Sequence, residues 1–412
     1  MSRAYLDDMN QANLPFAALV FLAIAPSVAH AESGDAPEIT PYANIRYRLE
    51  LVDQDGLAET ATASTVRVKA GLKIGEWHGF SALVEGEAIA RLGPKDYNDT
   101  VNGRTAFPVV ADPTDVLLNQ AWLKFKPVEQ ASITGGRQVV NFDNQRWVGS
   151  VGWRQNDQTF DAARVTLNPA KGVSADYFYS WRVNRIFGPD SPQGIWRDTN
   201  IHGARIAGSV AKNTTLTAYG YWLDIPAAPA ANSQTLGVRL AGAQPIKGEV
   251  KLLYAAEYAR QSDHAANPAD FKLDYLVLEP GISAKGFTAK LGFERLEGDG
   301  TVALQTPLAT LHAFNGWADV FLNTPANGLR DIYGDVSYKF GESSGVKGLL
   351  LRAAYHDFRS TNGSIDYGSE WDALIAYPLT KNIDISAKFA RYKADALATD
   401  RTKAWFSIDA KF

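Results

Sequence analysis

The sequence contains no cysteine among its 412 residues. Disulfide bonds, thiolate catalysis and cysteine metal ligands are therefore all excluded. Histidine is also scarce, with six residues, and none of them has the spacing of a zinc motif or stands beside a serine in a nucleophile–base arrangement. We therefore expect no catalytic residues, no metal and no cofactor, so that the protein is not an enzyme.

An excess of charge of either sign is also absent. The chain has 41 basic and 45 acidic residues, and its net charge is -4. This balance gives no sign of a nucleic-acid partner. No apolar run of about 18 residues follows the N-terminal region, which excludes a helical membrane protein.

The N-terminal region does contain one shorter apolar run, Phe16–Ala25. Pro26 follows it, and small residues then lead to Ala29-His30-Ala31. An apolar segment of this length before an A-x-A site predicts a secretory signal peptide over residues 1–31. A buried N-terminal helix is the alternative. The mature domain would then span residues 32–412.

The mature chain alternates between apolar and polar residues. In residues 42–51, YANIRYRLEL, one parity is mostly apolar and the other holds Arg46, Arg48 and Glu50. Residues 65–74, TVRVKAGLKI, repeat this pattern, and similar stretches occur at residues 80–91, 117–126, 250–260 and 287–296. A period of two predicts β-strands with one apolar and one polar face.

The breaks between these strands alternate between short and long. Short breaks such as NPAKG and PLTKN are separated by longer polar segments, at residues 52–63, 92–115, 141–157, 187–199, 225–233, 262–270, 298–330, 361–366 and 395–401. About 18 strands with short turns at one end and long loops at the other predict an all-β fold, a transmembrane antiparallel β-barrel with periplasmic turns and extracellular loops. A soluble β-sandwich or propeller is the alternative, but it would have shorter strands.

The C-terminal sequence AWFSIDAKF alternates in the same way and ends on Phe412. A last strand that ends in Phe resembles the signal recognised by the outer-membrane assembly machinery. Tyr and Trp residues also gather near strand ends, where their rings suit the headgroup level of a bilayer. We therefore expect the outer membrane of a Gram-negative bacterium as the location, with its lipids and assembly machinery as partners.

If the apolar parity faces lipid, the polar parity faces the lumen. It is rich in both signs of charge, with Arg46, Arg48, Arg67, Lys69, Lys73, Lys124, Arg164, Arg182, Lys251 and Arg352 against Glu50, Glu85, Glu87, Asp176, Glu257, Glu294 and Asp372. Such a lumen must contain water, because isolated charges are too costly in a dry interior. These charges either pair across the wall and hold the barrel open or form a selectivity constriction.

The third long break, residues 141–157, combines both signs of charge with Trp147 and Trp153 and has glycines in its middle. This composition favours a loop that folds inward and narrows the lumen over a disordered surface loop. We predict that Arg137, Arg146 and Arg154 form a basic ring, and that Asp143 and Asp157 hold these side chains in place.

Two segments resemble a known family. GRQVVNFDNQRWVGSVGWRQNDQTFDAARV and TPLATLHAFNGWADVFLNTPANGLRDIYGD are similar to two characteristic blocks of the alginate export family of outer-membrane proteins. The resemblance implies an 18-stranded barrel with an electropositive, arginine-lined constriction. It also implies that Arg137, Asp143, Arg146, Arg154 and Asp157 lie in the block that lines the path.

We therefore expect a channel for an anionic polysaccharide or oligosaccharide similar to alginate. Its substrate path would include Arg46, Arg48 and Arg182 of the lumen parity, besides the residues of the block. Arginine can bind a sugar carboxylate through two hydrogen bonds. The alternatives are a general diffusion porin for small polar solutes, a barrel enzyme and a plugged structural barrel.

Overall fold

The computed structural model describes residues 36–93 and 95–412. The predicted signal peptide, residues 1–31, lies outside the described residues. The described chain forms one sheet of 18 strands: β1 (Ile39–Gln54), β2 (Ala61–Trp77), β3 (Phe80–Arg91), β4 (Asp115–Val128), β5 (Ala131–Gln138), β6 (Thr159–Ala170), β7 (Val173–Asn184), β8 (Ile195–Ala211), β9 (Thr214–Asp224), β10 (Ser233–Lys247), β11 (Val250–Asp263), β12 (Lys272–Ala284), β13 (Phe287–Leu296), β14 (Leu329–Lys339), β15 (Leu350–Arg359), β16 (Asp366–Pro378), β17 (Ile383–Ala394) and β18 (Arg401–Lys411).

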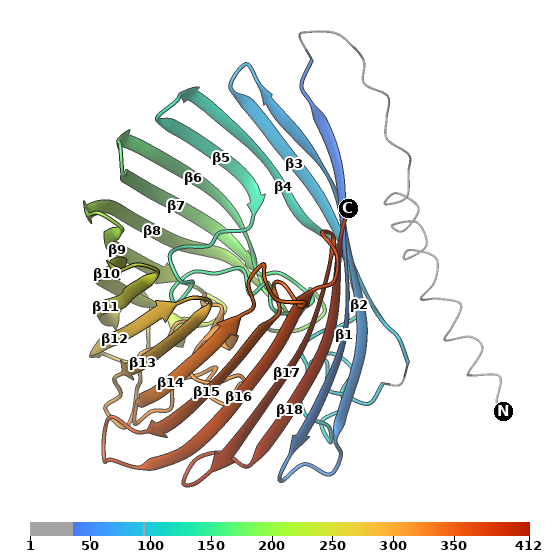
Figure 1. The fold of residues 1–412 in the computed structure, drawn as a ribbon, viewed down its shortest axis with the longest axis vertical. Coiled ribbons are helices and arrows are strands. Elements are labelled where there is room, and N and C mark those ends of the chain that lie inside the picture. The colour runs from blue at the N-terminus through green and yellow to red at the C-terminus, as the bar shows by residue number, and fades with distance from the viewer. Residues whose placement is uncertain (1–35, 94) are drawn as a thin grey trace, which may run out of the picture.

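The sheet closes on itself. Every strand pairs antiparallel with its neighbours in sequence, and β1 pairs with both β2 and β18. Figure 1 shows the resulting ring, in which the first and last strands lie side by side. Closure leaves no strand edge unpaired, which a bilayer requires because lipid offers no hydrogen-bond partners. The predicted fold class, an antiparallel barrel of about 18 strands, is confirmed.

The two faces of the strands follow the predicted parity. On β18, Phe406 and Ile408 are 40% and 36% exposed, whereas Trp405 and Ser407, which alternate with them, are 3% and 4% exposed. Exposed large apolar side chains recur around the outer wall, and charged side chains are buried on the inner side. The alternating sequence therefore produces a wall that is apolar towards lipid and polar towards the lumen.

The turns at one end of the barrel are mostly two residues long. In the turn between β12 and β13, Lys285 and Gly286 both have positive φ, 48° and 86°. This conformation matches the twist of the two strands and favours glycine. A Cβ atom on Gly286 would also lie 2.3 Å from the carbonyl oxygen of Lys339 in the next strand.

The long loops all lie at the other end, so the predicted alternation of the two ends is correct. The lengths do not alternate strictly, however. The connection between β14 and β15 covers residues 340–349 at the short-turn end, and it is longer than the loop at residues 55–60 at the opposite end.

Two of the long loops pass into the ring of strands. We call residues 139–158, between β5 and β6, the third loop, and residues 297–328, between β13 and β14, the seventh loop. Both contribute to one apolar cluster with the inner wall, through Phe142, Trp147, Leu308, Trp317 and Phe321 among others. The described helices are the short η1 (Pro229–Ala231) and η2 (Leu311–Ala313), and neither could cross a membrane.

Candidate solute path

The third loop is fixed inside the barrel by Trp147. Its indole Nε1 donates a hydrogen bond of 2.8 Å to Oε1 of Glu257 on β11, and its ring meets that of Tyr275 on β12 edge to face at 5.1 Å. Trp147 is only 8% exposed. Burial of this large ring beside a satisfied N–H group stabilises the inward position of the loop.

Two arginines of the third loop reach carboxylates of the wall. Arg146 Nε lies 2.8 Å from Glu294 Oε1 on β13, and Arg154 Nη1 lies 3.0 Å from Glu50 Oε2 on β1. Both arginines are buried, at 2% and 6% exposure. Removal of one partner from a buried pair leaves an uncompensated charge, so these contacts hold the loop in place.

The seventh loop uses wall carboxylates in a different way. The backbone N–H of Ala318 in this loop donates a hydrogen bond of 2.7 Å to Oε1 of Glu370 on β16. The backbone N–H of Trp317 donates one of 3.3 Å to Oδ2 of Asp372 on the same strand. Gly316 precedes them with φ +83°, and a Cβ there would lie 2.5 Å from the Glu370 carboxylate. Glycine at this position therefore lets the loop backbone approach the carboxylate closely.

The two inner loops also bond directly to each other. Gly149 N–H donates to the carbonyl of Leu308 at 2.9 Å, and Thr310 N–H donates to the carbonyl of Gln145 at 3.0 Å. Gln158 Nε2 reaches the same Leu308 carbonyl at 2.9 Å. The loops thus form one body across the lumen.

A cluster at this junction, which we call the lysine box, surrounds Lys388 of β17. Its ammonium nitrogen lies 3.9 Å from the ring centroid of Trp153 and 3.8 Å from that of Trp317. It also lies 2.7 Å from Nε2 of His312, whose Nδ1 is 2.7 Å from Oδ1 of Asp319. A neutral imidazole that carries its proton on Nδ1 satisfies both contacts, since Lys388 then donates and Asp319 accepts.

The environment of the lysine box shifts the pKa values of its two titratable loop residues, His312 and Asp319. Burial lowers the pKa of His312 to about 3, and the Lys388 ammonium acts in the same direction against the opposing effect of Asp319. Burial alone would raise the pKa of Asp319, but Lys403, His312 and Arg154 hold it well below its usual range. The imidazole is therefore neutral and the carboxylate charged at neutral pH.

The predicted basic ring does not form. Arg146 and Arg154 pair with wall carboxylates as described, and Arg137 binds Asp161 of β6 through two hydrogen bonds of 2.7 and 3.0 Å. The predicted partners of these arginines bind elsewhere, because Asp143 lies 2.8 Å from Arg205 of β8 and Asp157 pairs with Lys69 of β2. The ring prediction is wrong because each of these charged residues pairs with a wall residue of opposite charge. It does not pair with another charged residue of the third loop.

The remaining predicted path residues face the lumen. Arg46 pairs with Asp409 at 2.7 Å and donates to the carbonyl of Gly152 at 2.9 Å. Arg48 donates to the carbonyl of Trp153 at 2.5 Å, and its guanidinium carbon lies 4.1 Å from the Trp153 ring centroid. Arg182 lies 3.7 Å from Asp161 and is part-exposed. Arg46 and Arg48 thus support the third loop from β1.

The position of the seventh loop was predicted only in part. We predicted an extracellular loop here and made no prediction that it folds inward, yet Leu304, Leu308 and Phe321 are packed in the inner apolar cluster. Asn323 near its end is exposed at the long-loop end. The seventh-loop residues His312, Trp317 and Asp319, which contact the wall and the third loop, were not predicted as site residues. The signal in the sequence was the stretch TLHAFNGWADVF, which is rich in aromatic and charged residues.

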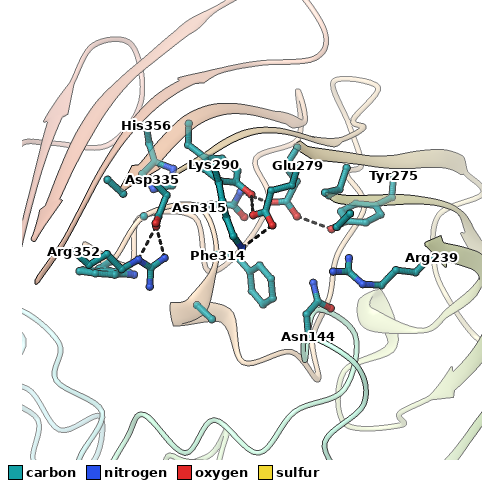
Figure 2. A pocket seen from close by; sticks show the side chains of 18 residues that line it. Asn144, Arg239, Tyr275, Glu279, Lys290, Phe314, Asn315, Asp335, Arg352 and His356 are labelled. Carbon is teal, nitrogen blue, oxygen red and sulfur yellow. Dashed lines mark hydrogen bonds and ion pairs between the residues drawn. The ribbon is translucent and has the colours of Figure 1, made fainter. Parts of the chain in front are cut away.

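A cavity of about 310 Å³ lies between the inner loops and the wall of β10 to β15. Figure 2 shows Phe314, Asn315 and Asn144 on the loop side, and Arg239, Lys290 and Arg352 on the wall side. Lys290 pairs with Glu279 at 2.9 Å and Arg352 with Asp335 at 2.5 Å. Because Lys290 and Arg352 lie near the short turns of β13 and β15, this cavity faces the short-turn end.

Among the described residues, several inner-wall cations have no carboxylate within ion-pair distance. They include Arg48 on β1, Arg67 on β2, Lys388 on β17 and Arg401 on β18, the strand between β17 and β1. Arg67 donates instead to Asn44 Oδ1. In residues 36–93 and 95–412, no group of three or more His, Asp or Glu side chains is placed to hold a metal ion.

A closed barrel with an apolar outer wall, a charged lumen and inward-folded loops is an outer-membrane channel. A family model described as alginate export matches residues 43–293. The match covers more than half of the chain, so the protein belongs to the alginate export family and resides in the outer membrane of a Gram-negative bacterium.

Solved structures with the same fold include OccAB4 of Acinetobacter baumannii, with 13% identity, a TM-score of 0.74 and coverage of 92% of this chain and 100% of that chain. A BenF-like porin from Pseudomonas fluorescens Pf-5 has 14% identity, a TM-score of 0.72 and coverage of 92% and 100%. OpdK of Pseudomonas aeruginosa, solved with vanillate, has 13% identity, a TM-score of 0.71 and coverage of 90% and 98%. No curated protein sequence matches significantly.

Proposed function

We propose that this channel conducts anionic saccharides that carry carboxylates, in the form of uronate oligosaccharides, and that it acts by transport and not by catalysis. The observation that carries the proposal is that Arg48, Arg67 and Lys388, on neighbouring parts of the wall, have no carboxylate within ion-pair distance among the described residues. Fixed cations beside a narrow aqueous path attract anions and repel cations. The alginate export family match supports a carboxylated sugar as the solute.

The part-exposed ion pairs of the wall suit such a solute. Arg137, Lys290 and Arg352 have side chains 21%, 34% and 40% exposed, and each is paired with one wall carboxylate. Exposed ion pairs contribute only about 0–1 kcal/mol, so a sugar carboxylate can replace the wall carboxylate at small cost. Contacts of this strength allow a solute to bind and then leave.

A second candidate is a porin selective for small carboxylates. The crowding of the lumen by two inner loops favours it, since the remaining cavity of about 310 Å³ is small for a polymer. The structural similarity to OpdK, which was solved with vanillate, also supports this candidate.

Planar-bilayer recording of the folded protein tests the proposal. Oligomers of mannuronate and guluronate added on one side should block the current transiently, whereas neutral malto-oligosaccharides of the same length should block it less at equal concentration. Block by benzoate but not by the uronate oligomers would support the small-carboxylate porin and overturn the saccharide proposal. Absence of any open-channel current would overturn both candidates.

A further inference from the structure

A second cavity lies at the long-loop end, away from the wall cations discussed above. Parts of the loops at residues 185–194, 225–232, 264–271 and 297–328 enclose it, and its volume is about 700 Å³. We call it the vestibule. It stands on the extracellular side of the inner loops, where a solute from the medium arrives first.

The lining of the vestibule is mostly apolar and carries almost no charge. Most of its lining is apolar, including Trp196, Ala227, Ala230, Phe271, Val302 and Leu322. Its polar lining consists of neutral side chains and Arg185, which is the one charged residue of the lining among the described residues. The cavity nearer the short turns, in contrast, is lined by charges of both signs, such as Arg239, Glu279 and Arg352.

Arg185 is held rigidly but without a counter-charge. Its guanidinium carbon lies 4.1 Å from the ring centroid of Trp196 and 4.8 Å from that of Phe187. Its Nη1 donates a hydrogen bond of 3.1 Å to the carbonyl of Gln193, and its buried Nε has no hydrogen-bond partner. No carboxylate among the described residues lies within ion-pair distance of it, and burial lowers its pKa to about 10.

We infer that the vestibule binds a small amphipathic monocarboxylate, with its acid group on Arg185 and an aliphatic or aromatic body against the apolar lining. A carboxylate supplies the missing counter-charge and can accept two hydrogen bonds from one guanidinium. An arginine in apolar surroundings binds a carboxylate more strongly than one in open water, because the local dielectric constant is lower.

The size and lining of the vestibule set the class of ligand. A volume of about 700 Å³ suits a molecule of drug-like size or smaller. A uronate oligomer has one charge on each sugar and many hydroxyl groups, and these would lose water against alanine, proline and phenylalanine side chains without new partners. This site therefore differs in chemistry from the wall cations, and its ligand differs from the uronate saccharides proposed above.

Calorimetric titration of the full-length barrel in detergent with benzoate tests this inference. Benzoate should bind, while acetate, which lacks the apolar body, and benzamide, which lacks the charge, should each bind at least about tenfold more weakly. Glucuronate, which has the charge but a polar body, should also bind weakly. None of these measurements requires conduction, so the result is independent of the ion selectivity of the channel.

Two variants localise the site. Arg185→Gln should weaken benzoate binding about tenfold, the ratio that corresponds to loss of one charge-assisted contact. Ala230→Glu places a competing carboxylate at an exposed position of the lining and should weaken it similarly without touching Arg185. Arg260→Gln is the matched control, because Arg260 lies on β11 at the same end but does not line the vestibule.

Each outcome decides the question once heat-modifiable mobility shows that the variants are folded. Absence of benzoate binding to the wild type, or unchanged binding to both Arg185→Gln and Ala230→Glu, overturns the site. Equal affinities for acetate and benzoate overturn the role of the apolar lining. Equal loss in Arg260→Gln would show that the binding reflects general surface charge.

Discussion

The indole of Trp153 stacks on the imidazole of His312 with ring centroids 4.3 Å apart and planes inclined by only 5°. These residues belong to different inner loops that are separated by more than 150 residues in the chain. The Lys388 ammonium of the wall lies over the same indole ring at 3.9 Å. One aromatic side chain therefore joins the third loop, the seventh loop and the barrel wall.

Replacement of this ring should loosen both loops. Trp153→Leu keeps an apolar side chain but removes the stacking and the cation–π contacts, each worth about 0.5–2 kcal/mol. We expect a larger mean single-channel conductance and more frequent current fluctuations in planar bilayers. Trp371→Leu is the control, because Trp371 is 60% exposed on the lipid-facing wall. Identical current traces for Trp153→Leu and wild type would show that the stacking does not hold the loops.

Acidification should loosen the loops and raise the conductance, as Trp153→Leu is expected to do. The pKa of His312 is lowered from 6.5 to about 3 with the loops docked, so the docked state takes up its proton only in strong acid. A released loop would bind this proton near pH 6.5. Docking is therefore fully stable above this pH and weakens as the pH falls from about 6.5 towards 3.

The pH dependence can be assigned to one residue. Single-channel conductance measured between pH about 7.5 and 4.5 should rise on acidification in the wild type, and His312→Gln should remove most of this rise. His202→Gln on β8 should keep it, because His202 contacts Tyr177 and lies outside the lysine box. A pH response that persists unchanged in His312→Gln would assign the effect to other groups.

The buried arginine of the third loop should matter more for stability than a part-exposed arginine of the wall. Arg154→Gln leaves the buried carboxylates of Glu50 and Asp319 with Lys403 as their remaining close cation. Loss of one partner from a buried ion pair costs about 3–5 kcal/mol, whereas an exposed pair is worth about 0–1 kcal/mol.

Urea unfolding in detergent should therefore show a much lower midpoint, or earlier loss of the loops, for Arg154→Gln than for Arg137→Gln. The latter disrupts only the pair with Asp161, whose two side chains are 21% and 15% exposed. Equal midpoints for the two variants would mean that the Arg154 contacts do not anchor the loop.

The parity of the last strand gives a test of the barrel itself. Ile408→Asp places a charge on the lipid face, whereas Ser407→Asp places it on the wet inner face. A charged side chain in the hydrocarbon region costs up to a few kcal/mol of folding free energy, and the cost is about 2 kcal/mol or more near the bilayer centre. The yield of folded, heat-modifiable barrel should fall severalfold for Ile408→Asp only. Comparable yields of the two variants would contradict the assignment of the faces.

The barrel could be predicted from the sequence because its signal is local. Alternation in residues 42–51 or 404–412 depends only on neighbouring positions, and closure follows from the repeated pattern. The loop contacts could not be predicted in this way. Arg146 and Glu294 are far apart in the chain, and nothing near either residue indicates the other.

The inward position of the third loop illustrates the same limit. Trp147 and Trp153 indicated that this loop should be buried, and the structure places it in the lumen. The composition does not say which carboxylates receive Arg146 and Arg154, so the predicted ring with Asp143 and Asp157 was wrong. The wall acids that hold the loops, Glu50 among them, looked from the sequence like any other lumen charge.

The central claim is that the wall cations without an ion-pair partner make the channel prefer anions. The most direct measurement is the reversal potential of the wild-type channel across a gradient of potassium chloride, with the lower side near 0.1 M. We predict that the sign of the reversal potential corresponds to a preference for chloride over potassium. We also predict that the preference declines when both sides approach 1 M, because the Debye length falls from about 10 Å to about 3 Å. A reversal potential of zero, or one of the sign for potassium preference, would contradict the account.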